Sequence, residues 1–393
     1  MPKKFGADWL FTISDKPIKN GVVSVDDNGK ILLVEQYARR TSAISWYNGA
    51  ICPGFVNTHC HLELSHLKNA IPEKTGLLPF IKNVVTLRNT VSANEIKKAI
   101  TTAAKEMYQK GIVAVGDISN TTASFFEKEK GVLRYHTFVE AFDLHPKQTK
   151  QAMKNAIDAF RKVPKTLRST ASITPHAPYT CTPQLYALID RFAAEHCNIL
   201  SIHNQESKHE NFLFENELDG WPQLYNNWNI EQRGFKPKDN TALPAMSKYL
   251  SSFNQIIYVH NIFTNKRDIE WAENHFQRVF WCTNPNANLY IENTLPDYDM
   301  FRSANVKITI GTDSLASNHQ LDIFEELKTI KAHYTAISTA ELLQWATLNG
   351  AQALRFDNEL GSLEIGKTPG LVCIDDVSPN GEITEQSAAR RIY

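Results

Sequence analysis

The sequence predicts an α/β protein, a (β/α)8 TIM barrel with a small β-sandwich domain formed from both chain ends. Three observations lead to this prediction: eight short apolar runs, amphipathic segments between them, and turn-rich alternating stretches at the two termini. A chain of 393 residues with 42% hydrophobic content can bury a core of that size. We therefore expect sandwich segments at 1–50 and 361–393 around a barrel at 51–360.

Both terminal stretches consist of short runs of alternating apolar and polar residues separated by turn residues. In the first, Asn20-Gly21 and the sequence DNG at 27–29 are β-hairpin signals. The last stretch, GSLEIGKTPGLVCIDDVSPNGEITEQS from Gly361, has the same character. We expect the two stretches to build one small sandwich, and two unrelated terminal β arms are the alternative.

Between the termini, strand-like runs alternate with helical segments, which is typical of parallel strands joined by helices. Helical spacing of apolar residues is clear in SANEIKKAITTAAKEMYQKG, PKQTKQAMKNAIDAFRKV and STAELLQWATLNGAQALR. An open doubly wound sheet is the alternative, but no G-x-G-x-x-G follows any strand-like run. The eight predicted strands are Ile51 to Thr58, Gly111 to Ile118, Leu133 to Phe142, Ser169 to Thr174, Ile199 to His203, Gln255 to His260, Arg278 to Cys282 and Val306 to Ile310.

The charge balance points to a small-molecule ligand. Lys plus Arg and Asp plus Glu both number 42, so neither nucleic acid nor an anionic membrane surface is an expected partner. Six cysteines without a Cys-x-x-Cys, no signal-peptide pattern and no run of transmembrane length favour the cytoplasm. A homodimer is compatible with the sequence. The long irregular stretch from Ser207 to Ala245 is typical of a functional loop.

Polar side chains that can bind metal or carry protons end the apolar runs, where barrel proteins place their chemistry. The first run ends in a His-x-His, whose two side chains share a face of an extended chain. One such pair is weak evidence, but the repetition along the chain indicates a metal site. The candidates are His59, His61, His176, His203, Glu206, His260 and Asp313.

Three of these residues also have purely structural interpretations. His176 stands between two prolines and could order a turn, His260 could be a hydrogen-bonded core histidine, and Asp313 could cap a turn or helix. The remaining histidines fall in helical or loop contexts, and we assign them to surface or structural roles: His66, His136, His145, His196, His209, His275, His319 and His333.

The motifs PGFVNTHCH, HNQE, VHN, GTDSLASN and GSLEIGKTPGLVCID resemble those of the amidohydrolase superfamily over nearly the whole chain. The resemblance implies that His59, His61, His203 and Asp313 hold one divalent metal. The fourth-strand lysine that is carboxylated in two-metal members has no counterpart in TPHAPYT, so one ion is expected. Imidazole and carboxylate ligands suit zinc first, with iron or manganese as alternatives.

The H-x-x-E of His203 and Glu206, together with NPNANLYI and TDSLASN, resembles the mononuclear deaminase and chlorohydrolase branch of that superfamily. THCHLELSHL, LPFIKNVVTLR and the FLFENELDGW loop leading to LPAMSKYL are similar to 6-aminodeoxyfutalosine deaminase-like proteins. The resemblance implies a fold with a terminal β domain and a hydrolytic reaction on an aminated or halogenated heterocycle.

We expect a water activated by the metal to attack the carbon that carries the amino group. Asp313 would take a proton from the water, Glu206 would give one to the ring, and His260 would stabilise the tetrahedral centre. His176 would contact the substrate. Glu63 would bind a ribose or a polar ring edge if the chain stays extended after His61, and the alternative for it is a salt-bridged rim residue.

The sequence therefore predicts a metal-dependent hydrolytic deaminase of an aminated purine-type nucleoside or a related heterocycle, such as 6-aminodeoxyfutalosine. Hydrolysis of an amide or halide in the same site is the first alternative, and a catalytically inactive metal-binding scaffold is the second. A zinc deaminase of the H-x-E and P-C-x-x-C type is excluded, because the chain has no P-C-x-x-C.

Overall fold

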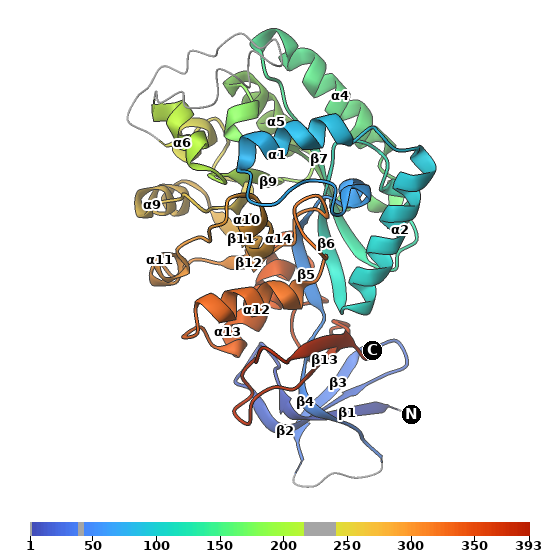
Figure 1. Cartoon of the computed structure of the whole chain (residues 1–393). Coiled ribbons are helices and arrows are strands. Elements are labelled where there is room, and N and C mark those ends of the chain that lie inside the picture. Colours follow the sequence, from blue (N-terminus) through green and yellow to red (C-terminus); the bar gives the residue numbers. More distant parts are fainter. Residues whose placement is uncertain (1, 38–42, 216–240) are drawn as a thin grey trace.

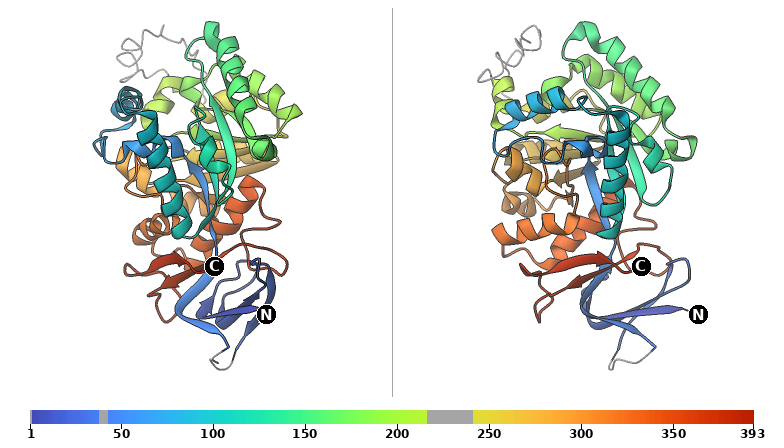
Figure 2. Two further views of the ribbon diagram at one scale, coloured as in Figure 1. Left: turned by 90° about the vertical axis from the view of Figure 1, so that its right-hand side faces the viewer. Right: turned by 45° about the vertical axis from the view of Figure 1, so that its right-hand side comes forward.

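A computed structural model of the chain describes residues 2–37, 43–215 and 241–393. A sheet near both chain ends lies beside a larger α/β part in which helices surround parallel strands (Figure 1). Figure 2 shows the same two parts from two further sides, with the N- and C-termini both on the small sheet. In the described part of the chain, no helix is both long and apolar enough to cross a membrane.

The terminal sheet has six strands in the order β14-β13-β4-β1-β2-β3. The two chain ends build one small domain, as predicted, but their described strands share one hydrogen-bonded sheet and not the two sheets of the predicted sandwich. The chain ends are joined by the antiparallel pairing of β13 with β4, in register from Leu371 opposite Pro53 to Ile374 opposite Ala50. The strands are β1 (Lys3–Leu10), β2 (Ile18–Val25), β3 (Ile31–Gln36), β4 (Ser45–Pro53), β13 (Leu371–Asp375) and β14 (Ala388–Arg391).

The first predicted barrel strand is split by Gly54. Residues up to Pro53 belong to β4 and extend past the predicted boundary at residue 50, whereas β5 begins at Phe55 and pairs with β6. A side chain at Gly54 would meet the Pro369 carbonyl oxygen at 2.6 Å and Val113 Cγ1 at 2.3 Å. Apolar residues continue on both sides of the glycine, so the hydrophobic pattern alone does not reveal the change of sheet.

The α/β part contains two four-stranded parallel sheets, in the orders β5-β6-β7-β8 and β12-β11-β10-β9. The eight predicted strands are present, with ends shifted where turns shorten or lengthen them. They are β5 (Phe55–Cys60), β6 (Ile112–Ser119), β7 (Arg134–Ala141), β8 (Ala171–Pro175), β9 (Ile199–Asn204), β10 (Gln255–His260), β11 (Arg278–Thr283) and β12 (Ile308–Ile310).

The carboxyl ends of the two sheets meet at both edges. Between β8 and β9, the His203 amide donates to the His176 carbonyl oxygen at 2.9 Å. Between β12 and β5, the amides of Thr312 and Asp313 donate to the His59 carbonyl oxygen at 3.0 and 3.1 Å. The backbone contacts that join the sheets are thus made by residues of the candidate site.

Helices follow the strands along the chain and cover them on the outside (Figures 1 and 2). The predicted segment at 93–109 is a helix that starts with a capping box, in which Ser92 and Glu95 bond each other's backbone. The helices up to β10 are α1 (Leu77–Leu87), α2 (Ala93–Gln109), α3 (Phe125–Lys128), α4 (Thr149–Lys162), α5 (Pro183–Glu195), α6 (Lys208–Glu215) and α8 (Ala242–Ser247). Those after it are α9 (Lys266–His275), α10 (Pro285–Ile291), α11 (Tyr298–Ser303), α12 (Ile323–His333), α13 (Thr339–Gln344) and α14 (Gly350–Leu354).

Two predicted segments differ in detail. The predicted helix STAELLQWATLNGAQALR contains a π-helical turn at Trp345–Asn349 between α13 and α14, and Asn349 Nδ2 donates to the Ile308 carbonyl oxygen of β12 at 2.8 Å. The predicted loop between Ser207 and Ala245 begins in α6 and ends in α8, while residues 216–240 lie outside the described residues.

Candidate metal centre

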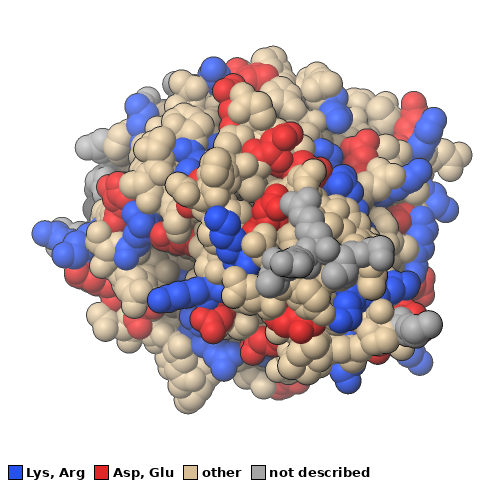
Figure 3. Space-filling model, turned by 90° about the horizontal axis from the view of Figure 1, so that it is seen from below, with Lys and Arg blue, Asp and Glu red and all other residues tan. Residues whose placement is uncertain are grey.

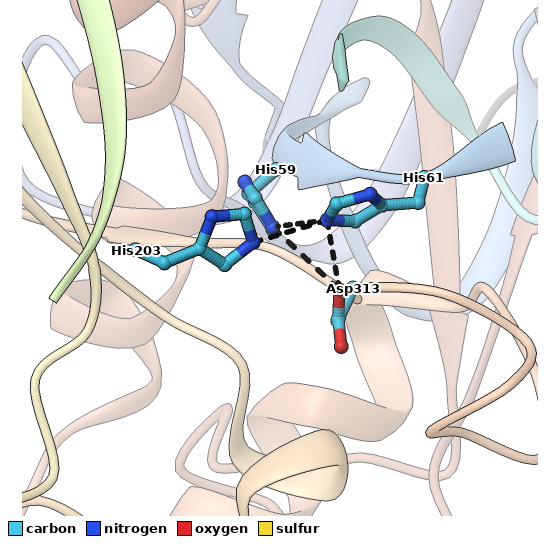
Figure 4. Close-up of side chains that lie close together, drawn as sticks. All are labelled: His59, His61, His203 and Asp313. Carbon is cyan, nitrogen blue, oxygen red and sulfur yellow. Dashed lines mark hydrogen bonds and ion pairs between the residues drawn. The ribbon is translucent and has the colours of Figure 1, made fainter. Parts of the chain in front are cut away.

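Two histidines at the end of β5 face each other, as expected for residues two apart in an extended chain. Their Nε2 atoms are 3.1 Å apart. His59 is fully buried and His61 is 8% exposed, because the strand ends in the middle of the α/β part. Figure 4 shows both rings turned toward the same point.

His203 and Asp313 complete this cluster from two other strand ends (Figure 4). His203 Nε2 lies 3.1 Å from His61 Nε2, and Asp313 Oδ1 lies 3.3 Å from His61 Nε2 and 3.6 Å from His59 Nε2. One ligand atom from each of the four residues lies within 4.8 Å of the others. The structure thus brings together all four residues that the sequence suggests as metal ligands.

Outer contacts orient these ligand atoms inward. His203 Nδ1 donates to the His176 carbonyl oxygen at 3.0 Å, which leaves the Nε2 lone pair pointing into the cluster. The Ser317 hydroxyl donates to Asp313 Oδ2 at 2.5 Å and leaves Oδ1 facing the imidazoles. His61 Nε2 has three neighbours, and a single proton on it could satisfy only one of them.

The protonation states suit a divalent cation. Burial lowers the pKa of His59 and of His203, and it lowers the pKa of His61 to about 3, so the three imidazoles are neutral near pH 7. Burial alone would raise the pKa of Asp313, but the His59 hydrogen bond and the imidazoles of His61 and His260 outweigh it and lower the pKa. Three neutral imidazoles and one carboxylate are a donor set that fits zinc.

Glu206 and His260 lie beside the cluster. Glu206 Oε2 is 3.7 Å from His260 Nε2, and both side chains are buried. Burial raises the pKa of Glu206 well above its usual range, and the negative charges of Asp313 and Glu292 add to the effect. His260 Nδ1 lies 2.8 Å from Asn288 Oδ1 and donates to it, so that Nε2 is the accepting nitrogen. A proton donor and a proton acceptor therefore stand next to the candidate metal centre.

His176 lies between this cluster and the rim. Its ring centroid is 4.7 Å from that of His203 and 6.3 Å from that of Phe142, whose side chain is half-exposed. Its Nδ1 is 2.7 Å from Thr180 Oγ1, so His176 also orders the turn after β8, as its structural interpretation expects. Its role as a substrate contact stays a prediction.

The extended backbone on which the assignment of Glu63 depends is not present. The chain does not stay extended after His61 but forms a 3-10 helix, η1 (Leu62–Leu67). The buried Glu63 carboxylate pairs with Arg88 at 3.2 Å and accepts hydrogen bonds from the Thr121 amide and hydroxyl at 3.0 and 2.7 Å. These contacts match the alternative of a salt-bridged residue, and a substrate-binding role for Glu63 stays a prediction.

Two buried residues of β7 escaped the sequence analysis. His136 is in the middle of this strand and not in a helix or loop, and its Nε2 is 3.1 Å from Ser172 Oγ. Glu140 is the last residue but one of the strand, accepts from Asn120 Nδ2 at 2.6 Å and lies 3.4 Å from His203 Nδ1, with burial raising its pKa to about 8. The predicted strand extends to Phe142, so the strand-end criterion that selects the other candidates passes over Glu140.

Four residues with left-handed backbone conformations lie around the centre. Gln205, His260, Asn261 and Asp313 have φ values of 46°, 73°, 59° and 57° at the ends of β9, β10 and β12. Such values cost non-glycine residues about 1 kcal/mol or more and persist where the surrounding structure imposes them. Three strands thus hold strained backbone at the place where their polar side chains converge, which is typical of functional sites.

Burial of a further carboxyl predicts a pH-dependent stability. Glu210 of α6 is fully buried, its Oε2 accepts from the Glu206 amide at 3.2 Å, and burial raises its pKa to about 8. The folded-state pKa is above the usual value, so the favourable contribution exists at low pH and is lost as the pH rises through about 8. In metal-free protein we expect Glu210→Gln to gain stability relative to wild type between pH 6 and 9, by at least about 1 kcal/mol. Urea unfolding at both pH values measures this difference, and parallel curves would contradict it.

The chain is similar to known proteins in sequence and in fold. The chain is 24% identical over 384 residues to a 5'-deoxyadenosine deaminase of Methanococcus maripaludis, covering 93% of this chain and 84% of the relative. The aminofutalosine deaminase of Helicobacter pylori in complex with methylthio-coformycin superposes with a TM-score of 0.81 at 20% identity, covering 97% and 93% of the two chains. An adenosine deaminase of Xanthomonas campestris with bound zinc gives a TM-score of 0.75 at 22% identity, covering 98% and 88%.

A family model covers most of the sequence, including the two C-terminal strands of the small sheet, β13 and β14, and every residue of the candidate centre. The model is that of the amidohydrolase family, and it matches residues 50–393. This chain belongs to the amidohydrolase family.

Proposed function

We propose that the protein is a metal-dependent hydrolytic deaminase of an aminated purine-type nucleoside. The observation that carries the proposal is the convergence of three neutral imidazoles and a carboxylate on one point, with the proton donor Glu206 and the proton acceptor His260 beside it. Relatives and structural neighbours named as deaminases of 5'-deoxyadenosine, adenosine and aminofutalosine support this substrate class. The proposed substrates are 6-aminodeoxyfutalosine and related nucleosides.

The proposal includes the architecture that positions the site. Two parallel four-stranded sheets whose edges meet through His59, His176 and Asp313 are consistent with a (β/α)8 barrel. In such a barrel the carboxyl ends of the strands form one face, which explains why residues more than a hundred positions apart in the chain converge. The small sheet lies beside the barrel and contributes none of the residues proposed for chemistry.

Zinc is the metal we propose, with iron and manganese as alternatives that the same ligand types accept. His59, His61, His203 and Asp313 would hold it. Bound there, a divalent cation supplies a Lewis acid that lowers the pKa of water from about 16 to about 7. The zinc in the Xanthomonas campestris structure supports this choice.

The side chains of this chain then divide the proton transfers. Water adds to the carbon that carries the amino group, Asp313 takes one proton from the water, and Glu206 gives one to the adjacent ring nitrogen. The C–N bond breaks as the proton on Asp313 passes to the amino group and ammonia leaves. His260 accepts a hydrogen bond from the attacking water through Nε2, and the proton of the new hydroxyl returns to Glu206.

His176 and Glu63 are the proposed contacts to the part of the substrate that does not react. The ring of His176 contacts both His203 and the half-exposed Phe142, and the proposed nucleoside would extend from the centre past these rings. Glu63 would act at the rim together with its partner Arg88.

An ammonia-release assay on the zinc-loaded protein tests the proposal. The panel is 6-aminodeoxyfutalosine, 5'-deoxyadenosine, adenosine, S-adenosylhomocysteine, guanine and cytosine. We expect release from at least one adenine nucleoside and loss of that activity when a chelator removes the metal. Silence across the panel would contradict deamination and leave amide or halide hydrolysis, which product analysis with amide and chlorinated heterocycles would then detect.

The small-molecule character of the substrate fits the surface. Lys and Arg side chains alternate with Asp and Glu on the face seen from below in Figure 3, without a large area of one sign. We propose that the protein acts in the cytoplasm, independently of nucleic acid and membranes, and that it can form a homodimer. All six cysteines are free thiols, which fits a reducing compartment. Light scattering of the purified protein would give its oligomeric state.

A further inference from the structure

A lysine and an aspartate form an ion pair deep inside the α/β part, and neither belongs to the proposed metal ligands or catalytic residues. Lys128 Nζ lies 2.6 Å from Asp117 Oδ2, and both side chains are fully buried. Lys128 ends the short helix α3, and Asp117 lies near the end of β6. No step of the proposed reaction uses either residue.

Every polar hydrogen of this lysine has a partner. Besides Asp117, its ammonium donates to Ser119 Oγ at 3.0 Å and to Thr137 Oγ1 at 3.1 Å. Asp117 Oδ2 also accepts from Ser124 Oγ at 3.1 Å. The lysine therefore fixes one carboxylate oxygen of Asp117 to three neighbouring segments, β6, α3 and β7.

The other carboxylate oxygen reaches the candidate metal centre. Asp117 Oδ1 accepts from the Leu62 amide at 2.8 Å, and Leu62 directly follows His61. At this point β5 ends and the 3-10 helix η1 begins, so the backbone changes direction right after the second histidine of the His-x-His. This hydrogen bond from the Leu62 amide to a buried carboxylate fixes that change of direction, and with it the position from which His61 projects.

Stability alone does not account for such a pair. Removing two charges from water costs several kcal/mol for each ion, and well-packed apolar residues in the same place are often as stable or more stable. A buried ion pair does, however, impose one arrangement on the groups around it. Contacts behind metal ligands typically contribute 10–100-fold to metal affinity.

We propose that Asp117, whose charge Lys128 balances, is a positioning residue: its hydrogen bond from the Leu62 amide fixes the backbone after His61 and thereby sets the position of His61 for metal binding. The inference rests on the proposed metal centre. Neither Asp117 nor Lys128 would contact the substrate or the metal. Asp117 would affect metal affinity only through the hydrogen bond that it accepts from the Leu62 amide.

Two double variants isolate that hydrogen bond. Both remove the charges. D117N/K128M keeps a carbonyl oxygen that can accept from the Leu62 amide, whereas the leucine of D117L/K128M has a similar volume but no acceptor. The zinc dissociation constant is measured for each by competition with a chromophoric chelator, and thermal unfolding of the metal-free proteins reports folding. A second acceptor-free variant, D117A/K128M, guards against a misfit of the leucine.

We expect D117N/K128M to bind zinc within a fewfold of wild type, and the folded acceptor-free variants to bind it about 10–100-fold more weakly. Equal zinc affinity in all three double variants would overturn the proposal. Failure of both acceptor-free variants to fold, while D117N/K128M folds, would also overturn it, because the hydrogen bond from the Leu62 amide would then be required for folding and would not act on metal affinity. If wild type itself binds no zinc, the metal centre fails independently of the comparison between variants.

Discussion

Replacing His59 with alanine is expected to remove the bound metal and the deaminase activity together. His59 is fully buried, and its Nε2 faces His61 at 3.1 Å and Asp313 at 3.6 Å. Zinc sites gain about 10–16 kcal/mol from four ligands, so the loss of one ligand should weaken zinc binding by at least about 100-fold. Metal analysis after gel filtration and ammonia release from the best substrate of the panel measure both effects.

A matched control separates this effect from the general loss of a histidine. His333 ends α12 on the surface, where its Nδ1 lies 2.9 Å from the Thr329 carbonyl oxygen, and H333A should keep both metal and activity. Because His59 is buried, thermal unfolding of the metal-free proteins must show that H59A still folds. Retention of one equivalent of zinc by folded H59A would exclude His59 as a ligand and remove the basis of the proposed mechanism.

The sequence predicted the residues of the candidate centre because the pattern and the chemistry coincide at strand ends. His59, His203, His260 and Asp313 each follow a short apolar run, and parallel strands deliver their carboxyl ends to the same face. Each run is short, and its end is marked by the change from apolar residues to a histidine or an aspartate. Convergence in space then follows from topology without knowledge of the loops.

Other features depend on contacts that no local pattern encodes. The change of sheet at Gly54 arises because β4 pairs with β13, more than three hundred residues away in sequence. The direction of Glu63 depends on the turn after His61, which Asp117 of the next strand fixes from outside the segment. The similar residue patterns of the two chain ends predict that they belong to one domain. They do not predict one shared sheet, because alternating apolar and polar residues indicate strands and not the partners of those strands.

Buried polar residues were the hardest to assign. His136 and Lys128 are polar residue types that a sequence pattern does not place in the interior. Their burial depends on partners such as Ser172 and Asp117, which only the structure shows. Glu140 differs, because it lies close to a strand end, but the predicted strand extends two residues beyond it to Phe142. The missed cases show that residue types at strand ends identify a reaction centre more readily than the contacts that support it.

Replacing Glu206 with glutamine should abolish turnover while the metal stays bound. The substitution keeps the shape of the side chain and removes the proton that the raised pKa of Glu206 makes available near neutral pH. Loss of a general acid typically lowers kcat by about 10²–10⁴-fold, whereas the four proposed ligands remain untouched. Steady-state ammonia release and metal content, measured on the same sample, give the two quantities.

The same pair of measurements distinguishes an enzyme from an inactive metal-binding scaffold. A scaffold would show no ammonia release to lose, and E206Q would then match wild type in every readout. E195Q, at the exposed end of α5, is the control and should keep full activity. If E206Q lost its metal along with its activity, Glu206 would belong to the ligand set, and the proton delivered to the ring nitrogen would have to come from another group.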